Sequence, residues 1–147
     1  MSEMLGNRYF IARQFNKAAI HLERALQDDP DSIKIKKKLI ICYIQTGAIK
    51  KALHYFYNIV IKDPQSIINT DPYYDDCPCS ELIPEWEQQA KKENFPQKIT
   101  LILGILYLYC DLDKSIFYLQ KSTQNHEHYQ EISAVIKKLT TQKNEFE

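Results

Sequence analysis

Two cysteines separated by one residue, Cys77 and Cys79, form the most reactive pair in the chain. Thiols at this spacing can ligate a metal ion or join in a disulfide. A structural zinc site needs four ligands, commonly with two residues between the members of each pair. The remaining cysteines, Cys42 and Cys110, lie far away in sequence. We therefore expect a loop with two partly buried cysteines and predict neither a metal nor a cofactor, with a metal- or thiol-responsive site at this pair as an alternative.

Histidines offer little further chemistry. His126 and His128 could complete a Cys2His2 set only if the fold brought them near the cysteine pair. His21 and His54 fall in apolar-periodic segments, with no nucleophile and acid at a recognisable catalytic spacing. The sequence contains no phosphate-binding glycine loop, nucleophile elbow or paired catalytic carboxylates. We therefore predict that the protein is not an enzyme.

Charge is strongly segregated although the formal net charge of the 147 residues is zero. Residues 32–62 carry seven lysines and no acidic residue, whereas residues 63–97 carry eight acidic residues and two lysines. The densest lysine run, Lys36 to Lys38, contains no arginine, and nucleic-acid readers usually combine a broad basic surface with arginine or exposed aromatics. We therefore expect a protein or peptide partner, with an acidic partner as one option, and not a nucleic acid.

The elements that must position these residues are helices. Only three glycines occur, and apolar residues recur at helical spacing along most of the chain. Prolines and clustered Asp and Asn predict a loop over 65–80. We expect helices at about 2–13, 16–28, 48–61, 82–94, 97–110, 114–119 and 127–144, and one more that follows the connector after Pro30 and ends at about residue 45. Pro84 would lie in the first turn of the helix at 82–94.

A period of 34 residues organises the first part of the chain. Leu5 returns as Leu39, and Tyr9 returns as Tyr43. The other repeated positions are Ala18 and Ala52, and Pro30 and Pro64. This period and these residue types resemble the tetratricopeptide repeat, a helix–turn–helix unit.

The resemblance implies an all-α fold, a right-handed superhelical stack of helix hairpins. We expect one domain spanning 1–147, with an insertion at 65–96 and a capping helix at 127–144. The repeats would be 1–31, 32–64 and a degenerate third at 97–126. In that third repeat Ser115 matches Ala52, and Gly104 and Tyr107 match the family's positions only if the turn is one residue shorter.

Proteins of this family usually bind other proteins, so the resemblance implies a protein-interaction adaptor or scaffold. The partner peptide or helix would lie in the concave groove formed by the first helices of the hairpins. The groove residues carried over by position are Asn7, Phe10, Lys34, Lys37, Lys38, Ile41, Ile44, Gln45, Leu101 and Tyr107. Alternatively, the insertion or the last helix covers Phe10, Ile41 and Ile44.

One subclass clamps the carboxylate tail of chaperones with Lys and Asn, but here the lysine position is Glu3 and an asparagine position is Ile41. An alternative function is a small dedicated chaperone of a specialised secretion system. No apolar run reaches the roughly 18 residues of a membrane span, and the start of the chain lacks the pattern of a signal peptide. We therefore expect a cytoplasmic protein with reduced cysteines; its oligomeric state stays open.

The acidic insertion is also a candidate to dock on the lysines before it. Exposed ion pairs contribute only about 0–1 kcal/mol each, so aromatic anchors would be needed. Tyr73, Tyr74 and Trp86 are the anchors we predict for this docking.

Overall fold

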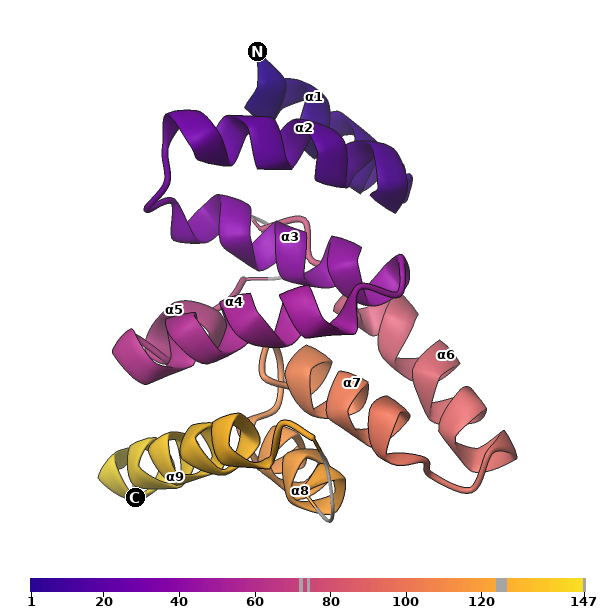
Figure 1. Ribbon diagram of the computed structural model, residues 1–147, viewed down its shortest axis with the longest axis vertical. Helices are drawn as coiled ribbons and strands as arrows, with labels where there is room; N and C mark the ends of the chain where they lie inside the picture. The colour runs from indigo at the N-terminus through magenta and orange to yellow at the C-terminus, as the bar shows by residue number, and fades with distance from the viewer. Residues whose placement is uncertain (72, 74, 124–126, 147) are drawn as a thin grey trace. The chain divides into compact units, whose positions relative to one another are not determined.

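The described part of the chain is entirely helical. The computed structural model describes residues 1–71, 73, 75–123 and 127–146, and these contain nine helices and no strand (Figure 1). The helices are α1 (Ser2–Ile11), α2 (Phe15–Asp28), α3 (Ile33–Gln45), α4 (Ile49–Lys62), α5 (Gln65–Ile68), α6 (Cys79–Lys92), α7 (Gln97–Tyr107), α8 (Leu112–Ser122) and α9 (Tyr129–Phe146).

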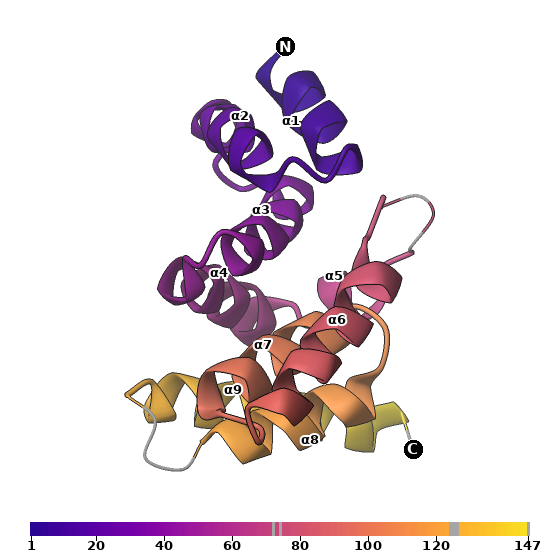
Figure 2. The same cartoon turned by 90° about the vertical axis from the view of Figure 1, so that its right-hand side faces the viewer.

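Two compact units make up the fold, Met1–Phe56 and Tyr57–Glu147, and the division falls within α4. In the first unit, α1 packs against α2, and α2 packs against α3. In the second unit, α6 packs against α7, α7 against α8, and α8 against α9 (Figure 1, Figure 2). The expectation of one domain spanning the whole chain stays a prediction.

Helix ends follow local capping chemistry. The Ser32 side-chain oxygen accepts a hydrogen bond from the Ile35 amide at 3.2 Å, and Asp111 accepts one from the Lys114 amide at 3.1 Å. Both side chains satisfy amides that the first turn of a helix leaves without partners. Gly47 follows α3 with a φ of 85°, a conformation that glycine adopts without the steric cost that a side chain adds.

The segment after Pro64 departs from the expected loop. It contains α5, whose Ile67 is fully buried, and α6 begins at Cys79 instead of residue 82. Pro84 therefore lies inside α6, and the prediction that it occupies the first turn is wrong. The carbonyl that loses its helical hydrogen bond belongs to Ser80, which is exposed, so water can replace the missing N–H.

Close helix contacts repeat in the first and last hairpins. A Cβ on Gly6 would lie 2.7 Å from the Leu22 side chain, and one on Gly104 would lie 2.6 Å from the Leu119 side chain. In the last hairpin the Ser115 hydroxyl also donates a hydrogen bond to the Gly104 carbonyl at 2.6 Å. The α7–α8 hairpin therefore repeats the packing of α1–α2, with a connection that is one residue shorter.

Helix α6 contacts α7 in the same way as α2 contacts α3. Tyr43 on α3 donates a hydrogen bond to Glu23 on α2 at 2.8 Å, and Tyr107 on α7 donates one to Glu87 on α6 at 2.7 Å. In both pairs the glutamate precedes the tyrosine by 20 residues. The segment expected to be an insertion thus supplies a helix that contacts α7 as α2 contacts α3, and the insertion itself stays a prediction.

Candidate partner-binding surface

Three of the predicted groove residues meet between α1 and α3. The Lys38 ammonium donates a hydrogen bond to the Asn7 side-chain oxygen at 2.9 Å and lies 5.7 Å from the centre of the Phe10 ring. Lys38 is only 5% exposed. An ammonium taken out of water needs such partners, and an aromatic face contributes through its negative potential. Lys38 therefore links two hairpins and does not present its charge to the surface.

The apolar residues predicted for the groove are buried within the chain. Their exposed fractions are 0% for Phe10, 2% for Ile41, 1% for Ile44, 1% for Leu101 and 6% for Tyr107. The expected apolar floor is thus not open to a partner in this structure.

The polar members of the predicted groove are more accessible. Lys34 is exposed, and Asn7, Lys37 and Gln45 are half-buried. All four lie on α1 or α3 in the first unit. The part of the predicted surface that a partner can reach is therefore polar and basic.

Tyr107 belongs to a recurring packing unit, which we call the tyrosine clamp. In the first unit it comprises Tyr43, with its hydroxyl on Glu23, the Lys51 ammonium 5.5 Å from the ring centre, and Tyr55 stacked at 5.9 Å. The second unit repeats this clamp with the residues Tyr107, Glu87, Lys114 and Tyr118. Tyr107 thus joins α6, α7 and α8, and this packing explains its burial.

The clamps also change the acidity of their tyrosines. Burial raises the pKa of Tyr43 well above its ordinary value, and the hydrogen bond to Glu23 raises it further. Burial likewise raises the pKa of Tyr107, followed by its hydrogen bond to Glu87. A tyrosinate next to a carboxylate would be repelled, so both hydroxyls keep their protons.

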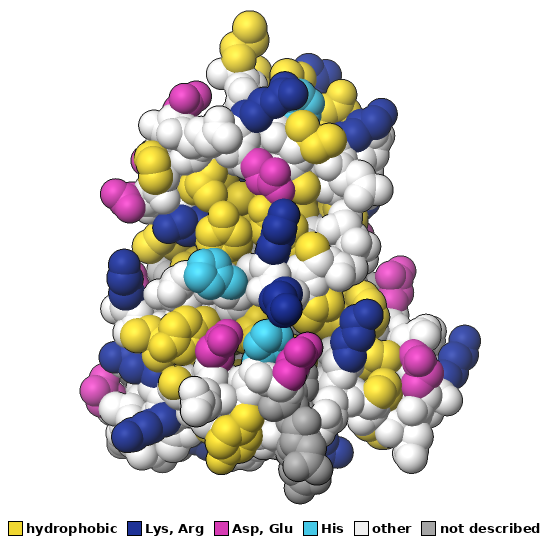
Figure 3. All heavy atoms as spheres, in the orientation of Figure 1, with side chains coloured by type: hydrophobic (Ala, Val, Ile, Leu, Met, Phe, Trp, Pro, Cys, Tyr) yellow, Lys and Arg dark blue, Asp and Glu magenta, His cyan; other side chains and the backbone are white. Residues whose placement is uncertain are grey.

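A cleft opens beside the first clamp. It encloses about 720 Å³, and hydrophobic side chains gather over α3 in the hollow between α2 and the start of α4 (Figure 3). The residues that line it are Glu23, Leu26, Gln27, Pro30, Tyr43, Lys50, Lys51, His54 and Tyr55. It combines an aromatic floor with two lysines on one wall.

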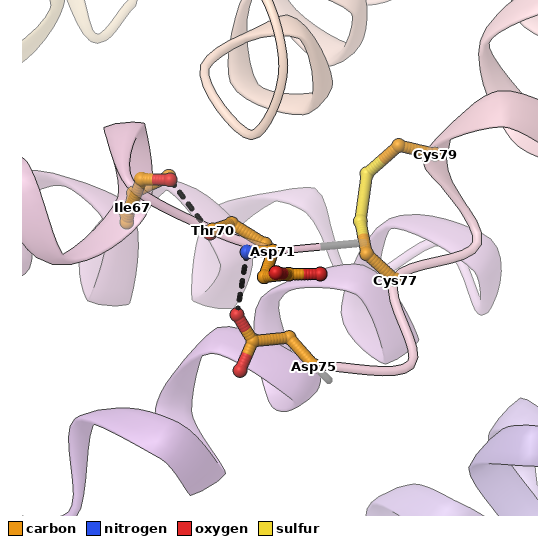
Figure 4. The surroundings of a disulfide bond; sticks show 6 residues. All are labelled: Ile67, Thr70, Asp71, Asp75, Cys77 and Cys79. Atoms are coloured by element: carbon orange, nitrogen blue, oxygen red, sulfur yellow. Dashed lines mark hydrogen bonds between the residues drawn. A yellow bond between two sulfur atoms is a disulfide. The ribbon is translucent and has the colours of Figure 1, made fainter. Parts of the chain in front are cut away.

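The cysteine pair differs from its prediction. Cys77 and Cys79 are joined by a disulfide, so the expectation that they are reduced is wrong (Figure 4). The adjacent loop is held by the Asp71 amide, which donates to the Asp75 carboxylate at 2.9 Å. Cys42 and Cys110 are free thiols, and Cys110 lines the same cavity of about 260 Å³ as the disulfide. Sequence proximity brings the pair together, because the main chain between them turns at Pro78 into the start of α6.

Metal ligation finds no geometric support in the residues that the structure describes, where no three His, Cys, Asp or Glu side chains gather at metal-binding distance. His126, one of the histidines considered for such a site, lies outside the described residues. His128 lies beside two carboxylates, 3.6 Å from Glu127 and 3.9 Å from Glu131.

The glutamates of the clamps were missed by sequence reasoning. The signal was nevertheless present, because each precedes a repeat tyrosine by the same 20 residues. A search for residues at a fixed distance from Tyr43 and Tyr107 would have identified both.

Comparisons with known proteins agree with this repeat geometry. The sequence profile described as tetratricopeptide repeat matches residues 9–69, a span that includes α2, α3 and α4. A comparison with curated proteins returned no match. Among the described residues, no helix is long and apolar enough to cross a membrane.

Proposed function

Since the chain is a tetratricopeptide repeat protein, and such repeats are a non-catalytic fold used generally for protein interaction, we propose that it is an adaptor that binds a partner peptide or helix on the first-helix face of its repeats. The family match supports a protein partner. We further propose that the partner contacts the positively charged lysines on α3.

The observation that carries the proposal is the accessibility of the lysines on α3. Lys34 is exposed and Lys37 is half-buried, while the apolar groove residues on the same helix, Ile41 and Ile44, are buried. Residues 32–62 carry seven lysines and no acidic residue. A positive surface of this kind attracts an acidic segment and accelerates its association, an effect that salt screens. We therefore propose an acidic peptide or an acidic helix face as the partner.

Charge reversal tests this proposal. We expect the double variant Lys34→Glu/Lys37→Glu to lose an acidic partner that the parent chain retains in affinity purification followed by mass spectrometry. Binding by the parent should also weaken between low and moderate salt, because exposed charge pairs separated by more than the Debye length of about 8–10 Å are screened.

The matched control reverses two other exposed lysines, Lys91 and Lys92 of α6, and should retain the partner. Identical partner sets for the parent and both variants would contradict a role for the α3 lysines. Circular dichroism of each variant separates a lost interaction from a lost fold.

A further inference from the structure

The first helix leaves open a face that the other first helices bury. Met4 is 66% exposed and Leu5 is 38% exposed. At the corresponding positions of α3, Lys38 is 5% exposed and Leu39 is fully buried. The corresponding residues of α7, Ile102 and Leu103, are fully buried as well.

The structure itself shows what covers this face in the two later cases. On α3 the Lys38 end of this face contacts Asn7 and Phe10 of α1, and α3 also packs against α2; α7 packs against α6. Each covering helix brings a glutamate to the hydroxyl of the repeat tyrosine, Glu23 to Tyr43 and Glu87 to Tyr107. The covering helix is thus defined by an apolar contact and by one carboxylate at a fixed place.

On α1 the same clamp is present except for its glutamate. The Tyr9 ring stacks on His21 at 5.4 Å, and the Lys17 ammonium lies 5.6 Å from its centre. These partners correspond to Tyr55 and Lys51 around Tyr43. Among the described residues, the Tyr9 hydroxyl has no hydrogen-bond partner, because no helix of this part of the chain covers α1 as α2 covers α3.

Charge at this place is also complementary to a carboxylate. Glu23 lies close enough to Cys42 of α3 that its charge contributes to the raised pKa of that thiol, after burial. The position of α1 that corresponds to Cys42 is Arg8, which is exposed. A glutamate placed on Tyr9 would therefore approach Arg8 and Lys17, both cationic, and a hydroxyl donor.

We propose that the open face of α1 docks an amphipathic helix of a partner protein, and that this helix places a glutamate on the Tyr9 hydroxyl as α2 and α6 do on theirs. Met4 and Leu5 contact its apolar side, and Arg8 and Lys17 flank the carboxylate. This surface lies on α1, whereas the lysines of the proposed function, Lys34 and Lys37, lie on α3.

A helix-stabilised peptide of residues 14–31, bridged between positions 20 and 24, serves as the probe because it carries Glu23 in its native setting. Isolated helices of this length are marginal in water, so circular dichroism must first show that the bridged peptide is helical. Fluorescence anisotropy then measures its binding to the full chain. We expect Met4→Asp to raise the Kd by about tenfold or more, because it places a charge in the apolar contact.

The carboxylate contact has a more specific signature. We expect Tyr9→Phe to raise the Kd of the parent peptide about 3- to 10-fold and to leave the Kd of the Glu23→Gln peptide nearly unchanged, as a double-mutant cycle requires of a direct pair. The control on the chain is Ile20→Asp, which charges an apolar residue that is 53% exposed on α2 and should not alter binding.

Two results would overturn the proposal. One is the absence of binding at about 1 mM by a peptide that is demonstrably helical, since this limit corresponds to a free energy of only about 4 kcal/mol. The other is self-association of the chain that sedimentation detects and Met4→Asp abolishes, because a second copy would then occupy the face.

Discussion

At the scale of single residues, the tyrosine clamp explains why a polar side chain is retained in a buried position. The Tyr43 ring is 4% exposed and packs between Lys51 and Tyr55, while its hydroxyl reaches the Glu23 carboxylate. A buried hydroxyl without a partner costs about 1–3 kcal/mol, whereas a bond to a charged acceptor contributes about 1.5–3 kcal/mol. The hydrogen bond to Glu23 therefore removes the cost of the buried hydroxyl and connects α2 to α3.

Removing that hydroxyl should lower stability in a way that depends on pH. We expect Tyr43→Phe to reduce the free energy of unfolding by about 1–2 kcal/mol at neutral pH. The pKa of Tyr43 in the folded chain is raised, so its contribution is complete below the unfolded pKa of about 10 and is lost as the pH rises above it. Urea melts between about pH 8 and 11 should therefore show a steeper decline for the parent than for the variant.

Two features of the chain serve as references for this measurement. Tyr129 is 55% exposed, so Tyr129→Phe should leave both the stability and its pH dependence unchanged. Burial raises the pKa of the Cys42 thiol to about 12, so the parent and the variant should share a further decline above about pH 9. Parallel pH curves for the parent and Tyr43→Phe would contradict the clamp.

The repeat residues were predictable from sequence, and their carboxylate partners were not. Tyr9 and Tyr43 stand out because the 34-residue period repeats their type and position. Glu23 has no counterpart one period later, where Tyr57 stands, so the period alone hides it. Its counterpart is Glu87, which is separated from Glu23 by the same number of residues as Tyr107 is from Tyr43.

The accessibility of the predicted groove residues could not be predicted for a different reason. Burial of Phe10, Ile41 and Ile44 depends on what else in the chain lies over α1 and α3, and a one-dimensional pattern contains no such information. Sequence reasoning left both outcomes open for these three residues. The inward turn of Lys38 toward Asn7 depends on side-chain geometry that spacing does not determine.

At the scale of helices, α6 is the element whose observed packing differs most from its predicted role. Its contact with α7 is equivalent to the contact of α2 with α3, and Glu87 is its polar link. The apolar residues Leu82, Ile83 and Ala90 are buried on the same helix. A helix with these buried residues contributes to the packing of the second unit.

This equivalence predicts matched effects of two substitutions. We expect Glu87→Gln and Glu23→Gln each to lower the free energy of unfolding by about 0.5–1.5 kcal/mol, because a charged acceptor becomes a neutral one. Denaturant melts followed by circular dichroism would measure both. Glu85→Gln, at an exposed position of the same helix, should stay within about 0.5 kcal/mol of the parent. A neutral effect of Glu87→Gln beside a costly Glu23→Gln would show that α6 is not the counterpart of α2.

At the scale of the whole molecule, the segregation of charge raises the question of whether the acidic segment docks on the lysines. Tyr73, one of the predicted anchors, is 83% exposed. Tyr74 lies outside the described residues, and Trp86 is half-buried in α6. Charge pairs alone are too weak to hold a loop, so the docking itself stays a prediction.

Hydrogen exchange at different salt concentrations tests the docking. The Asp75 amide donates to the Asp71 carbonyl at 2.9 Å, and the Asp71 amide donates to the Asp75 carboxylate at the same distance. We expect these local bonds to protect the loop, so its exchange should change little between about 10 mM and 1 M salt although the Debye length falls tenfold. Exchange that accelerates strongly in salt would instead favour charge-driven docking.

The position of Trp86 gives the molecule a built-in optical label. It is the single tryptophan of the chain and lies on α6, within the unit Tyr57–Glu147, next to the glutamate of the second clamp. Its emission therefore reports the environment of that unit selectively, whereas the far-ultraviolet signal sums over the helices of both. If the melting curves from tryptophan emission and from the far-ultraviolet signal coincide, the chain unfolds in a single cooperative transition. If they differ, they show which unit unfolds first.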